Sequence, residues 1–358
     1  MRLGQNPAKS IAQVPQPAPV TVAIVTYIPF LSGYYAESLE VLKVCLESLV
    51  QNTPQPFDLL VFDNASCPEV RSYLQNEHDA GRIQYLILAG QNFGKGGAWN
   101  FIFQGAPGEI IAYADSDIQF SPGWLESSLE ILQAFPKAGM VSAHPLRTPA
   151  ALYSSTLAWA QLASQAGLAS QSAPASQAGQ AGHTEQAGHN SQNEHTPRVG
   201  QSDPFDPDDE VQIEQGSFIP WEVYREHVLS LGTSEEQARE WYESRQDTRL
   251  TRQGVQALIG AAHFQFTVRK SIIQAFLPFK MDRPMGQVRT LDDQMNAAGW
   301  LRLATCEPLV RHLGNTLPVE PKTGQQLRTD HRRLWDTPVI RRVLLRVYDV
   351  IFRLYYGR

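Results

Sequence analysis

Cysteine is scarce in this chain, and long apolar runs are missing. Three cysteines, Cys45, Cys67 and Cys306, are scattered over 358 residues. They are too few for a disulfide framework or a four-thiolate zinc site. We therefore expect a reducing compartment and predict a cytoplasmic location. No apolar run is long enough for a membrane-spanning helix, and the first residues hold no signal-peptide core, so neither is expected.

Positive charge is also in short supply. The chain has 30 lysine and arginine residues against 36 aspartate and glutamate residues, which gives a net charge of −6. This balance excludes a chain-wide basic field for a nucleic-acid backbone, so no nucleic-acid partner is expected. The apolar fraction of 42% excludes a wholly disordered chain. The length suffices for one large domain or two ordinary ones.

Composition divides the chain into segments of different character. Residues 1–19 are rich in Pro, Gln and Ala and are predicted to be a flexible leader. Residues 164–204 repeat Gln-Ala-Gly with almost no bulky apolar residues. We predict a disordered low-complexity insertion there, because such a segment cannot offset the entropy cost of ordering. Residues 328–358 carry arginines and apolar residues at helical spacing, which predicts a basic amphipathic helix.

This C-terminal helix has two uses that the sequence leaves open. It can make a peripheral contact with an anionic membrane surface, such as the inner face of a membrane, where each arginine adds about 1 kcal/mol. It can instead pack against the domain or a second subunit. Arg346, Asp349 and Arg353 interrupt its apolar side, so it is not expected to span a membrane.

Apolar runs and amphipathic stretches alternate from residue 20 onward. Strands are expected at 20–25, 57–62, 83–88, 110–114 and 140–143, and helices at 37–50, 68–78 and 123–135, with a short helix after the Gly-rich stretch 92–100. This alternation favours an α/β fold with a mostly parallel central sheet and helices on both faces. Ligands bind such sheets outside the carboxyl ends of the strands. The polar clusters at 63–66, 92–100 and 115–117 should therefore meet in one crevice. Further along, strand structure is expected at 256–268, a helix at 290–298 and an ordered stretch at 309–313.

The triplet Asp115-Ser116-Asp117 follows a predicted buried strand. Two carboxylates at such a position are costly unless a cation neutralises them. Mg²⁺ and Mn²⁺ prefer carboxylate oxygens together with substrate phosphate. An ion there could neutralise a departing diphosphate. A solvated turn is the alternative.

The Gly-rich stretch 92–100 fits neither of two known phosphate-binding motifs. Trp99 stands where a dinucleotide fingerprint needs its third glycine. As a P-loop, the stretch is one residue short and has Gly96 where Ser or Thr is needed. Its glycines still allow the backbone to approach a ligand closely.

Three other positions carry a structural and a functional interpretation. Asp63 can bind a nucleobase or ribose, or can form an Asx-turn with its neighbours. Asp292 and Asp293 can complement a helix dipole or supply a general base. His312 can be structural or a metal ligand. The residue types alone leave all three open.

Taken in order, these clusters resemble inverting glycosyltransferases of family 2. The matching motifs, which span most of residues 20–316, are Val22–Tyr27, Asp63–Ser66, Asn92-x-Gly94 through Asn100, Ala114–Asp117, Asp292-Asp293 with Gly299, and His312–Asn315. The resemblance implies a glycosyltransferase A fold, which is Rossmann-like. It also implies a transferase domain over 20–327, with a nucleotide-sugar half at 20–145 and an acceptor half at 215–327.

The resemblance also implies roles for individual residues. Nucleotide-sugar-binding roles fall on Thr26, Tyr27, Asp63, Asn92, Gly94, Lys95, Asn100 and Asp115. Asp115 and Asp117 form a DxD motif, and Asp117, Asp115 and His312 are the implied ligands of a divalent cation, Mn²⁺ or Mg²⁺. Asp293 is the implied catalytic base, with Asp292 beside it.

The implied reaction is metal-dependent transfer of a hexosyl or deoxyhexosyl group from a nucleotide sugar, with a UDP- or dTDP-sugar favoured. The acceptor would be a hydroxyl of a glycan or a lipid-linked molecule, in cell-wall, polysaccharide or glycoconjugate synthesis. One alternative is a non-catalytic nucleotide-sugar or carbohydrate-binding protein. A sugar-phosphate nucleotidyltransferase is disfavoured, because Thr26–Phe30 follows the first strand in place of a Gly-rich signature with Arg and Lys. The oligomeric state is left open.

Overall fold

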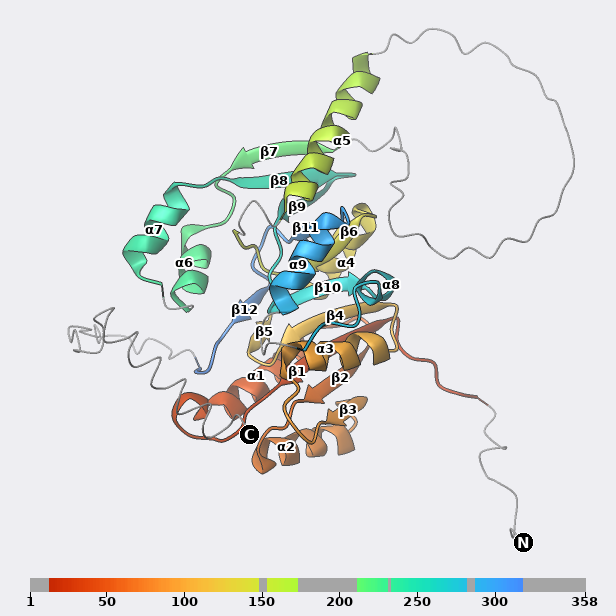
Figure 1. Cartoon of the computed structure of the whole chain (residues 1–358), viewed down its shortest axis with the longest axis vertical. Coiled ribbons are helices and arrows are strands. Elements are labelled where there is room, and N and C mark those ends of the chain that lie inside the picture. The colour runs from red at the N-terminus through yellow and green to blue at the C-terminus, as the bar shows by residue number, and fades with distance from the viewer. Residues whose placement is uncertain (1–12, 148–152, 173–210, 231–232, 282–286, 318–358) are drawn as a thin grey trace, which may run out of the picture. The chain divides into compact units, whose positions relative to one another are not determined.

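The chain adopts an α/β architecture in which helices cover both faces of one central sheet (Figure 1). The computed structural model describes residues 13–147, 153–172, 211–230, 233–281 and 287–317. These residues all fall within one compact unit that ends at Leu317. The predicted C-terminal helix at 328–358 and most of the predicted insertion lie outside the described residues. Within the described part, no helix has the length and apolar character needed to cross a membrane.

Ten of the described strands form the central sheet, in the order β3-β2-β1-β4-β10-β6-β11-β9-β8-β7. Their bounds are β1 (Val20–Thr26), β2 (Phe57–Asp63), β3 (Tyr85–Leu88), β4 (Ile110–Asp115), β6 (Ala138–Ser142), β7 (Gln212–Gly216), β8 (Asp247–Arg252), β9 (Val255–Ile259), β10 (Gln265–Arg269) and β11 (Leu301–Ala304). Two short strands, β5 (Ile118–Phe120) and β12 (Val310–His312), pair antiparallel in a separate ribbon.

The strands β1 to β4 are parallel to one another, as expected from sequences that are apolar on both faces. Their carboxyl ends therefore lie at the same edge of the sheet. The second half of the sheet is mixed. Strand β10 runs antiparallel to β4 and β6, β11 runs parallel to β6, and β7, β8 and β9 form an antiparallel meander.

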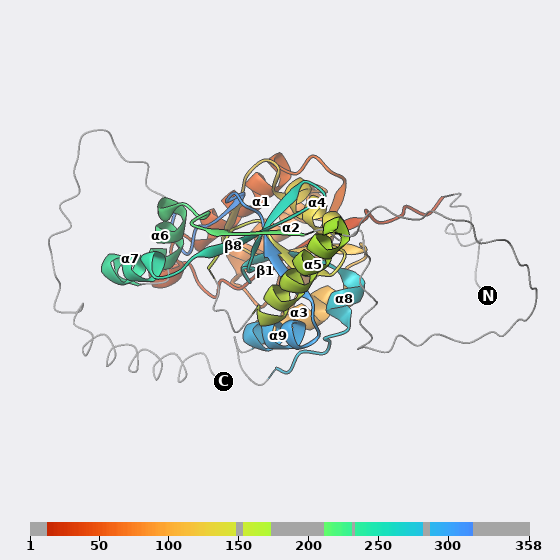
Figure 2. The same cartoon turned by 90° about the horizontal axis from the view of Figure 1, so that it is seen from above.

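The described helices are α1 (Ser38–Gln51), α2 (Pro68–Asp79), α3 (Gly94–Gly105), α4 (Trp124–Ala134), α5 (Ser154–Ser172), α6 (Trp221–Ser230), α7 (Glu235–Glu243), α8 (Lys270–Gln274) and α9 (Gln287–Ala297). A short 3₁₀ turn covers Gly33–Tyr35. Helices α1, α2 and α4 contribute to the apolar layer on one face of the sheet, and α3, α8 and α9 to the layer on the other face (Figure 2).

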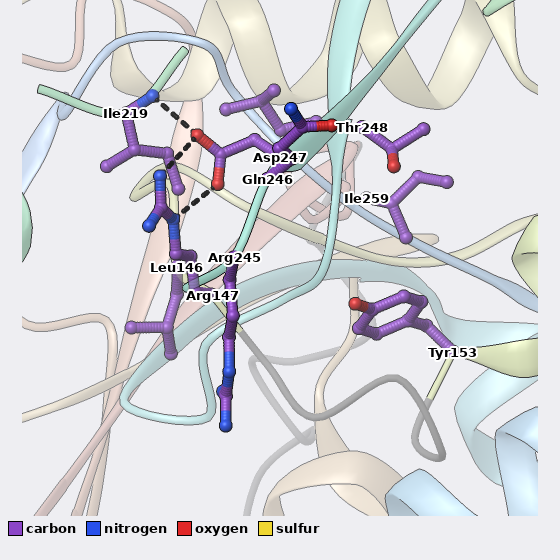
Figure 3. A pocket seen from close by; sticks show the side chains of 10 residues that line it. Leu146, Arg147, Tyr153, Ile219, Arg245, Gln246, Asp247, Thr248 and Ile259 are labelled. Atoms are coloured by element: carbon purple, nitrogen blue, oxygen red, sulfur yellow. Dashed lines mark hydrogen bonds and ion pairs between the residues drawn. The ribbon is translucent and has the colours of Figure 1, made fainter. Parts of the chain in front are cut away.

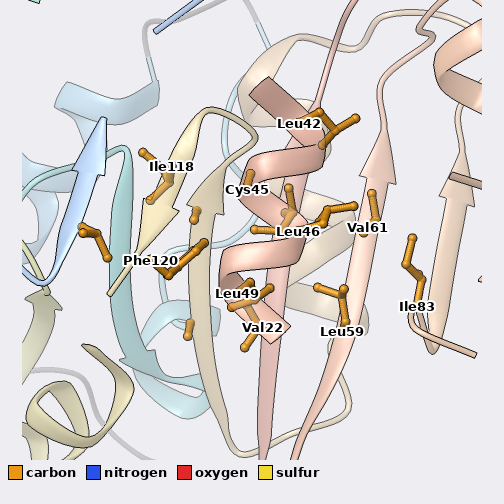
Figure 4. Packing of buried hydrophobic residues seen from close by; sticks show 14 of the residues in the cluster. Val22, Leu42, Cys45, Leu46, Leu49, Leu59, Val61, Ile83, Ile118 and Phe120 are labelled. Carbon is orange, nitrogen blue, oxygen red and sulfur yellow. The ribbon is translucent and has the colours of Figure 1, made fainter. Parts of the chain in front are cut away.

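Alternating residues of β1 divide the core between the two faces. Val22 and Ile24 pack on the face covered by α1, whereas Ala23 packs on the face covered by α3. On α1, Leu42, Cys45, Leu46 and Leu49 recur at spacings of three and four, and they point at the strands (Figure 4). This stripe is the helical face that the sequence pattern predicts. Each of the three leucine side chains stabilises the fold by about 1.5–3 kcal/mol through its burial.

Several boundaries differ from the expected ones. Helix α3 already begins at Gly94, inside the Gly-rich stretch. Helix α5 runs to Ser172, nine residues into the stretch that was expected to be disordered from 164 onward. Five of these nine residues are alanine, leucine or glutamine, which favour helix, against a single glycine, Gly167. The expected strand structure at 256–268 is two strands, β9 and β10, which are separated by Gly260–Phe264.

Candidate active site

The carboxyl ends of the parallel strands bring three predicted site residues to one edge. Thr26 lies opposite Asp63 in the β1–β2 pair, and Val25, one residue before Thr26, lies opposite Asp115 in the β1–β4 pair. The Thr26 hydroxyl is buried and has no hydrogen-bond partner among the described residues. Buried polar atoms are almost always paired in folded proteins. An unpaired hydroxyl at this edge is therefore consistent with a ligand that supplies the missing bond.

Asp63 is fully buried and organises the turn that follows β2. Its carboxylate accepts hydrogen bonds from the Ser66 backbone N–H at 3.1 and 3.3 Å and from Arg71 Nε at 2.9 Å. Arg71 reaches further and donates to the carbonyl oxygen of Ala89. The turn contains Ala65 at φ 71°, which is left-handed backbone that a non-glycine residue rarely adopts. Asp63 therefore has a structural role, in which its carboxylate binds the backbone three residues on, one residue further than in an Asx-turn. Its nucleotide-binding role stays a prediction.

The neighbouring Asn64 connects three loops at the same edge. Its backbone N–H donates to the carbonyl oxygen of Thr26 at 2.9 Å, and its side-chain nitrogen donates to Asn92 Oδ1 at 2.9 Å. Its side-chain oxygen accepts from the backbone N–H of Phe93 at 2.9 Å. Asn92 in turn accepts from the backbone N–H of Gly94 at 2.7 Å. Asn92 and Gly94, both predicted to bind the donor, are thereby fixed at the start of α3.

The close packing of Gly97 in α3 gives a testable prediction. A Cβ atom at Gly97 would lie 2.5 Å from Phe93 Cβ, an atom that cannot move without its backbone. We expect Gly97→Ala to lower the free energy of unfolding by about 1–3 kcal/mol, the usual cost of overpacking. Urea unfolding followed by circular dichroism measures this loss. Gly105→Ala is the matched control, because its Cβ meets nothing within 4 Å. Equal stability of Gly97→Ala and the control would contradict the prediction.

Lys95 and Asp115 form an ion pair at the carboxyl end of β4. The Lys95 Nζ lies 2.8 Å from a carboxylate oxygen of Asp115 and 5.5 Å from the ring centroids of Trp99 and Tyr113. Burial, together with the Asp115 carboxylate, raises the pKa of Tyr113 well above its usual value. The Tyr113 hydroxyl therefore stays protonated and donates to Asp115. The charge of Asp115 is thus already matched by protein groups.

Asp117 meets His312 although 195 positions separate them in the sequence. The ribbon of β5 and β12 aligns His312 with Ile118, and the backbone N–H of Leu313 donates to the Asp117 carbonyl at 2.8 Å. As a result, His312 Nε2 lies 3.2 Å from Asp117 Oδ2. The other carboxylate oxygen of Asp117 is buried and unpaired within the described residues, and so is His312 Nδ1.

Aromatic rings enclose His312. Its ring centroid lies 5.4 Å from that of Phe264 and 6.4 Å from that of His227, and His144 packs 5.6 Å from His227. Burial acts to lower the pKa of His312, but the hydrogen bond and charge of Asp117 outweigh it, so that this pKa lies above its usual value. Burial lowers the pKa of His227 to about 3, and the neighbouring His144 and His312 add to the effect.

The low pKa of His227 predicts a pH dependence of stability. Below the ordinary histidine value of 6.5, the unfolded chain binds a proton at this residue that the folded chain does not bind until about pH 3. The free energy of unfolding should therefore fall as the pH drops through this window, by at most about 1.4 kcal/mol per pH unit. His227→Phe should make the fall shallower. Urea unfolding in EDTA at several pH values compares the two proteins, and identical slopes would contradict the assignment.

The two acids on α9 have opposite environments. Asp292 is buried, with its Oδ1 2.7 Å from a guanidinium nitrogen of the buried Arg302 and its Oδ2 2.5 Å from His263 Nε2. Asp293, the predicted base, has 60% of its side chain exposed and lies 4.0 Å from the Nε of Arg289. The structure therefore separates the two members of this pair. The catalytic roles predicted for them remain predictions.

The other residues that were predicted to bind the donor are Tyr27 and Asn100. Tyr27 directly follows β1 and is half-buried. Asn100 uses both ends of its side-chain amide on the backbone of Phe279, with its nitrogen 2.9 Å from the carbonyl and its oxygen 2.7 Å from the N–H. These two bonds fix the loop after α8 against α3. A ligand would have to displace Phe279 to bind the Asn100 amide.

The described residues contain no group of three or more His, Cys, Asp or Glu side chains placed to hold a metal ion. The nearest arrangement is Asp117 with His312, a carboxylate and an imidazole. Both residue types are ordinary ligands of Mn²⁺. The unpaired buried oxygen of Asp117 fits a cation whose remaining ligands come from substrate phosphate and water.

A cavity is lined mostly by residues of the segment that was expected to bind the acceptor, 215–327. It measures about 390 Å³, and its lining residues are Leu146, Arg147, Tyr153, Ile219, Arg245, Gln246, Asp247, Thr248, Leu258 and Ile259. A buried ion pair forms part of its wall: Arg147 Nε lies 2.6 Å from Asp247 Oδ1 (Figure 3). Asp247 Oδ2 also accepts from the backbone N–H groups of Phe218 and Ile219, at 2.9 and 3.0 Å.

Sequence reasoning missed four residues that organise the site: Arg71, Tyr113, His263 and Arg302. Tyr113 and Arg302 lie inside buried strands, and His263 contacts Asp292, 29 positions away. The presence of an arginine eight residues after Asp63, on the predicted helix that follows this turn, could have suggested the Arg71 contact. No local pattern marks His263 as a partner of Asp292.

Comparison with known proteins agrees with these motifs. Residues 33–151 match the family described as glycosyl transferase family 2. A glycosyltransferase of Nostoc sp. is 26% identical over 102 residues, which cover 28% of this chain and 31% of that protein. The chain thus spans less than a third of the length of that relative.

Similar solved structures include S. aureus TarS (residues 1–349), with 17% identity over 37% of this chain and 39% of that one, at a TM-score of 0.30. The mannosyltransferase PcManGT of Pyrobaculum calidifontis, solved with GDP-Man and Mn²⁺, has 23% identity over 38% of this chain and 39% of its own, also at a TM-score of 0.30. The match over residues 33–151 takes in the Asp63, Gly94 and Asp115–Asp117 motifs. Residues 33–151 are thus similar to glycosyl transferase family 2.

Proposed function

We propose that this chain is an inverting, metal-assisted glycosyltransferase that moves a sugar from a nucleotide sugar to an acceptor hydroxyl. The observation that supports this proposal best is the meeting of Asp117 and His312 at 3.2 Å, beside the strand edge that holds Thr26 and Asp115. Asp117 and His312 are far apart in the sequence, and one carboxylate oxygen of Asp117 is buried and unpaired within the described residues.

The donor half of the proposed reaction uses the loops at this edge. The Thr26 hydroxyl and the backbone of the Gly94 turn, where φ is 69°, are placed to accept the nucleotide. Lys95 supplies a positive charge next to the position proposed for the diphosphate, and Asp115 and Tyr113 hold it in place. Relatives in complex with UDP-GlcNAc and GDP-Man support a nucleotide-sugar donor for this chain as well.

A divalent cation fits this site, and Asp117 and His312 would hold it, with Asp115 close by. Such a cation supplies charge neutralisation for a leaving diphosphate. Asp117 provides the anionic oxygen, and Phe264 and His227 shield His312 from water. The Asp117 and His312 side chains are 29% and 20% exposed, and a bound donor would shield them further from water and so strengthen their electrostatic contacts.

Inversion follows when the acceptor oxygen attacks the anomeric carbon from the face opposite the diphosphate. This step needs a base near the acceptor hydroxyl, and the resemblance places it in the pair Asp292–Asp293. A positioned base contributes roughly 10²–10⁴ to the rate. The acceptor class, a glycan or a lipid-linked molecule in polysaccharide or glycoconjugate synthesis, belongs to the same proposal. So does a cytoplasmic location.

A thermal-shift screen tests the donor proposal directly. Purified chain is heated with UDP-glucose, UDP-GlcNAc, dTDP-rhamnose and GDP-mannose, each with Mn²⁺ or with EDTA. We expect at least one donor to raise the melting temperature, more strongly with Mn²⁺ than with EDTA. Release of nucleoside diphosphate from that donor then distinguishes an enzyme from a non-catalytic binder. No stabilisation by any donor would contradict the proposal.

A further inference from the structure

The cavity shown in Figure 3 contains polar side chains that the rest of the described chain does not use. Its volume of about 390 Å³ is within the usual range for sites that bind small molecules. Four of its lining side chains make no hydrogen bond or ion pair with other described residues: Tyr153, Arg245, Gln246 and Thr248. Ligand sites typically combine an apolar wall with a few polar groups that converge in this way.

The other charged groups of the cavity are already matched. Asp247 lies 2.6 Å from Arg147 Nε through its Oδ1, and its Oδ2 accepts from Arg147 Nη2 at 3.1 Å. Arg147 also donates to the carbonyl oxygen of Tyr242 at 2.5 Å and lies 4.2 Å from the centroid of that ring. Among the described residues that line the cavity, Asp247 is the only acid. Arg245 therefore adds a positive charge that the lining does not compensate.

Tyr153 can support an anion that Arg245 holds. In Figure 3 the Tyr153 hydroxyl points toward the side of the cavity that carries Arg147 and Arg245. Burial raises the pKa of Tyr153 above its usual value, although the charge of Arg245 acts in the opposite direction. The hydroxyl is therefore protonated at neutral pH, and it can donate a hydrogen bond to an oxyanion.

An apolar wall completes the cavity. Ile219, Leu258 and Ile259 line it and are buried. A guanidinium binds a carboxylate or a phosphate group with two parallel hydrogen bonds, whereas an aliphatic wall packs against the C–H surface of a sugar ring. A free inorganic ion would leave this wall uncovered. The lining therefore fits a sugar ring that carries an oxyanion.

The segment that follows β6 connects the cavity with the proposed donor site. His144 Nδ1 lies 2.9 Å from the carbonyl oxygen of Val310, and Val310 begins β12, which ends at His312. Arg147 follows His144 by three residues, which span at most about 11 Å of chain. The cavity is thus placed to hold one unit of an acceptor while another unit presents its hydroxyl to the donor.

We propose that this cavity binds an acidic sugar unit of the acceptor, with Arg245 holding its carboxylate or phosphate group and Tyr153 donating to the same group. This inference rests on the proposed function, and it narrows the acceptor to one that carries acidic sugars. Arg245 lies two residues before Asp247, so the buried ion pair of Asp247 with Arg147 fixes the chain from which Arg245 reaches the ligand.

The test measures the binding of glucuronate, glucose 6-phosphate and neutral glucose by saturation-transfer NMR, with and without UDP and Mn²⁺. We expect both acidic sugars to bind more tightly than glucose, whether or not UDP is present. Arg245→Gln should weaken their binding roughly ten- to a hundredfold, as expected for a hydrogen bond to a charged group, and leave glucose unaffected. Tyr153→Phe should weaken it roughly two- to tenfold. The acidic sugar that binds more tightly identifies the anion.

Arg225→Gln is the matched control, because Arg225 is an exposed arginine on α6 that pairs with Glu235 and does not line the cavity. It should bind all three sugars as wild type does. The inference is overturned if neither acidic sugar binds at millimolar concentration, if glucose binds equally well, or if Arg245→Gln keeps the wild-type affinity. Displacement of the acidic sugars by UDP with Mn²⁺ would also overturn it, because they would then occupy the donor site.

This assay contains no nucleotide sugar, so its outcome is separate from that of the donor screen. Failure here would leave the proposed transfer reaction standing with a different acceptor. Failure of the donor screen would refute the proposed function, and binding of the acidic sugars would then describe a sugar-binding protein.

Discussion

Asp117→Asn should lower nucleoside-diphosphate release by roughly 10²-fold or more. The substitution keeps the volume of the side chain but removes the negative charge that would bind a cation and that pairs with His312. Loss of such an electrostatic contact costs several kcal/mol of transition-state stabilisation, and each 1.4 kcal/mol is about a factor of ten in rate. The measurement is initial rate against Mn²⁺ concentration for wild type and variant.

The control for this variant is Asp79→Asn. Asp79 is an exposed residue on α2 that contacts Gln75, and its replacement should leave both rate and Mn²⁺ dependence unchanged. Calorimetry with Mn²⁺ and UDP gives a second readout that is independent of turnover, and Asp117→Asn should weaken the binding of the pair. An Asp117→Asn protein with the wild-type rate and Mn²⁺ dependence would remove Asp117 from the site.

Asp247→Ala should lower the free energy of unfolding by about 3–5 kcal/mol, the largest stability loss that we expect for a single substitution here. The Arg147 and Asp247 side chains are 4% and 3% exposed. Removing the carboxylate leaves a buried guanidinium without its counter-ion. It also leaves the backbone N–H groups of Phe218 and Ile219 without their acceptor. Urea unfolding followed by tryptophan fluorescence measures the loss.

Two further variants separate the charge effect from simple loss of packing. Arg147→Met combined with Asp247→Ala removes both charges, and it should recover much of the stability because no buried ion remains unpaired. Glu235→Ala breaks the exposed pair with Arg225, whose side chain is 42% exposed, and should change the stability little because solvent screens such pairs. A loss at Asp247→Ala no larger than that at Glu235→Ala would contradict the prediction.

The first half of the fold could be predicted from the sequence because its pattern is local. Strands β1, β2 and β4 are apolar on both faces, and α1 carries its buried residues at regular helical spacing. Each of these elements can be recognised from its own residues alone. The α/β class and the common edge of the strand ends follow from that pattern, and the structure confirms both.

The second half could not be predicted in the same way, because its pattern is set by distant partners. Strand β11 contains Arg302, a fully buried charge that Asp292 compensates from α9. Strand β8 reads as a polar segment, yet its first residue, Asp247, is buried against Arg147. The charged residues make both segments poor candidates for a buried strand by local propensity. The tertiary ion pairs compensate the buried charges, and these pairs cannot be seen in the local sequence.

In the site, too, some contacts could be predicted from the sequence and others could not. The resemblance predicted that Asp117 and His312 act together, and the structure brings them within 3.2 Å. The contact of His263 with Asp292 has no counterpart in the prediction, because it depends on a turn after β9 that meets a helix 29 positions away. Sequence order reveals which residues follow strands. It does not reveal which of two adjacent acids is buried.

The ribbon of β5 and β12 joins two segments that are far apart in the chain through three paired positions. Ile118, Phe120 and Val310 of this ribbon are buried in the core together with residues of α1 and β1, so packing as well as pairing holds the ribbon in place. A ligand that bridges Asp117 and His312 would add a further connection between its two strands. The amide of Leu313, which donates to the Asp117 carbonyl, should then exchange its hydrogen with solvent more slowly when donor and Mn²⁺ are present, and would report occupancy without any turnover.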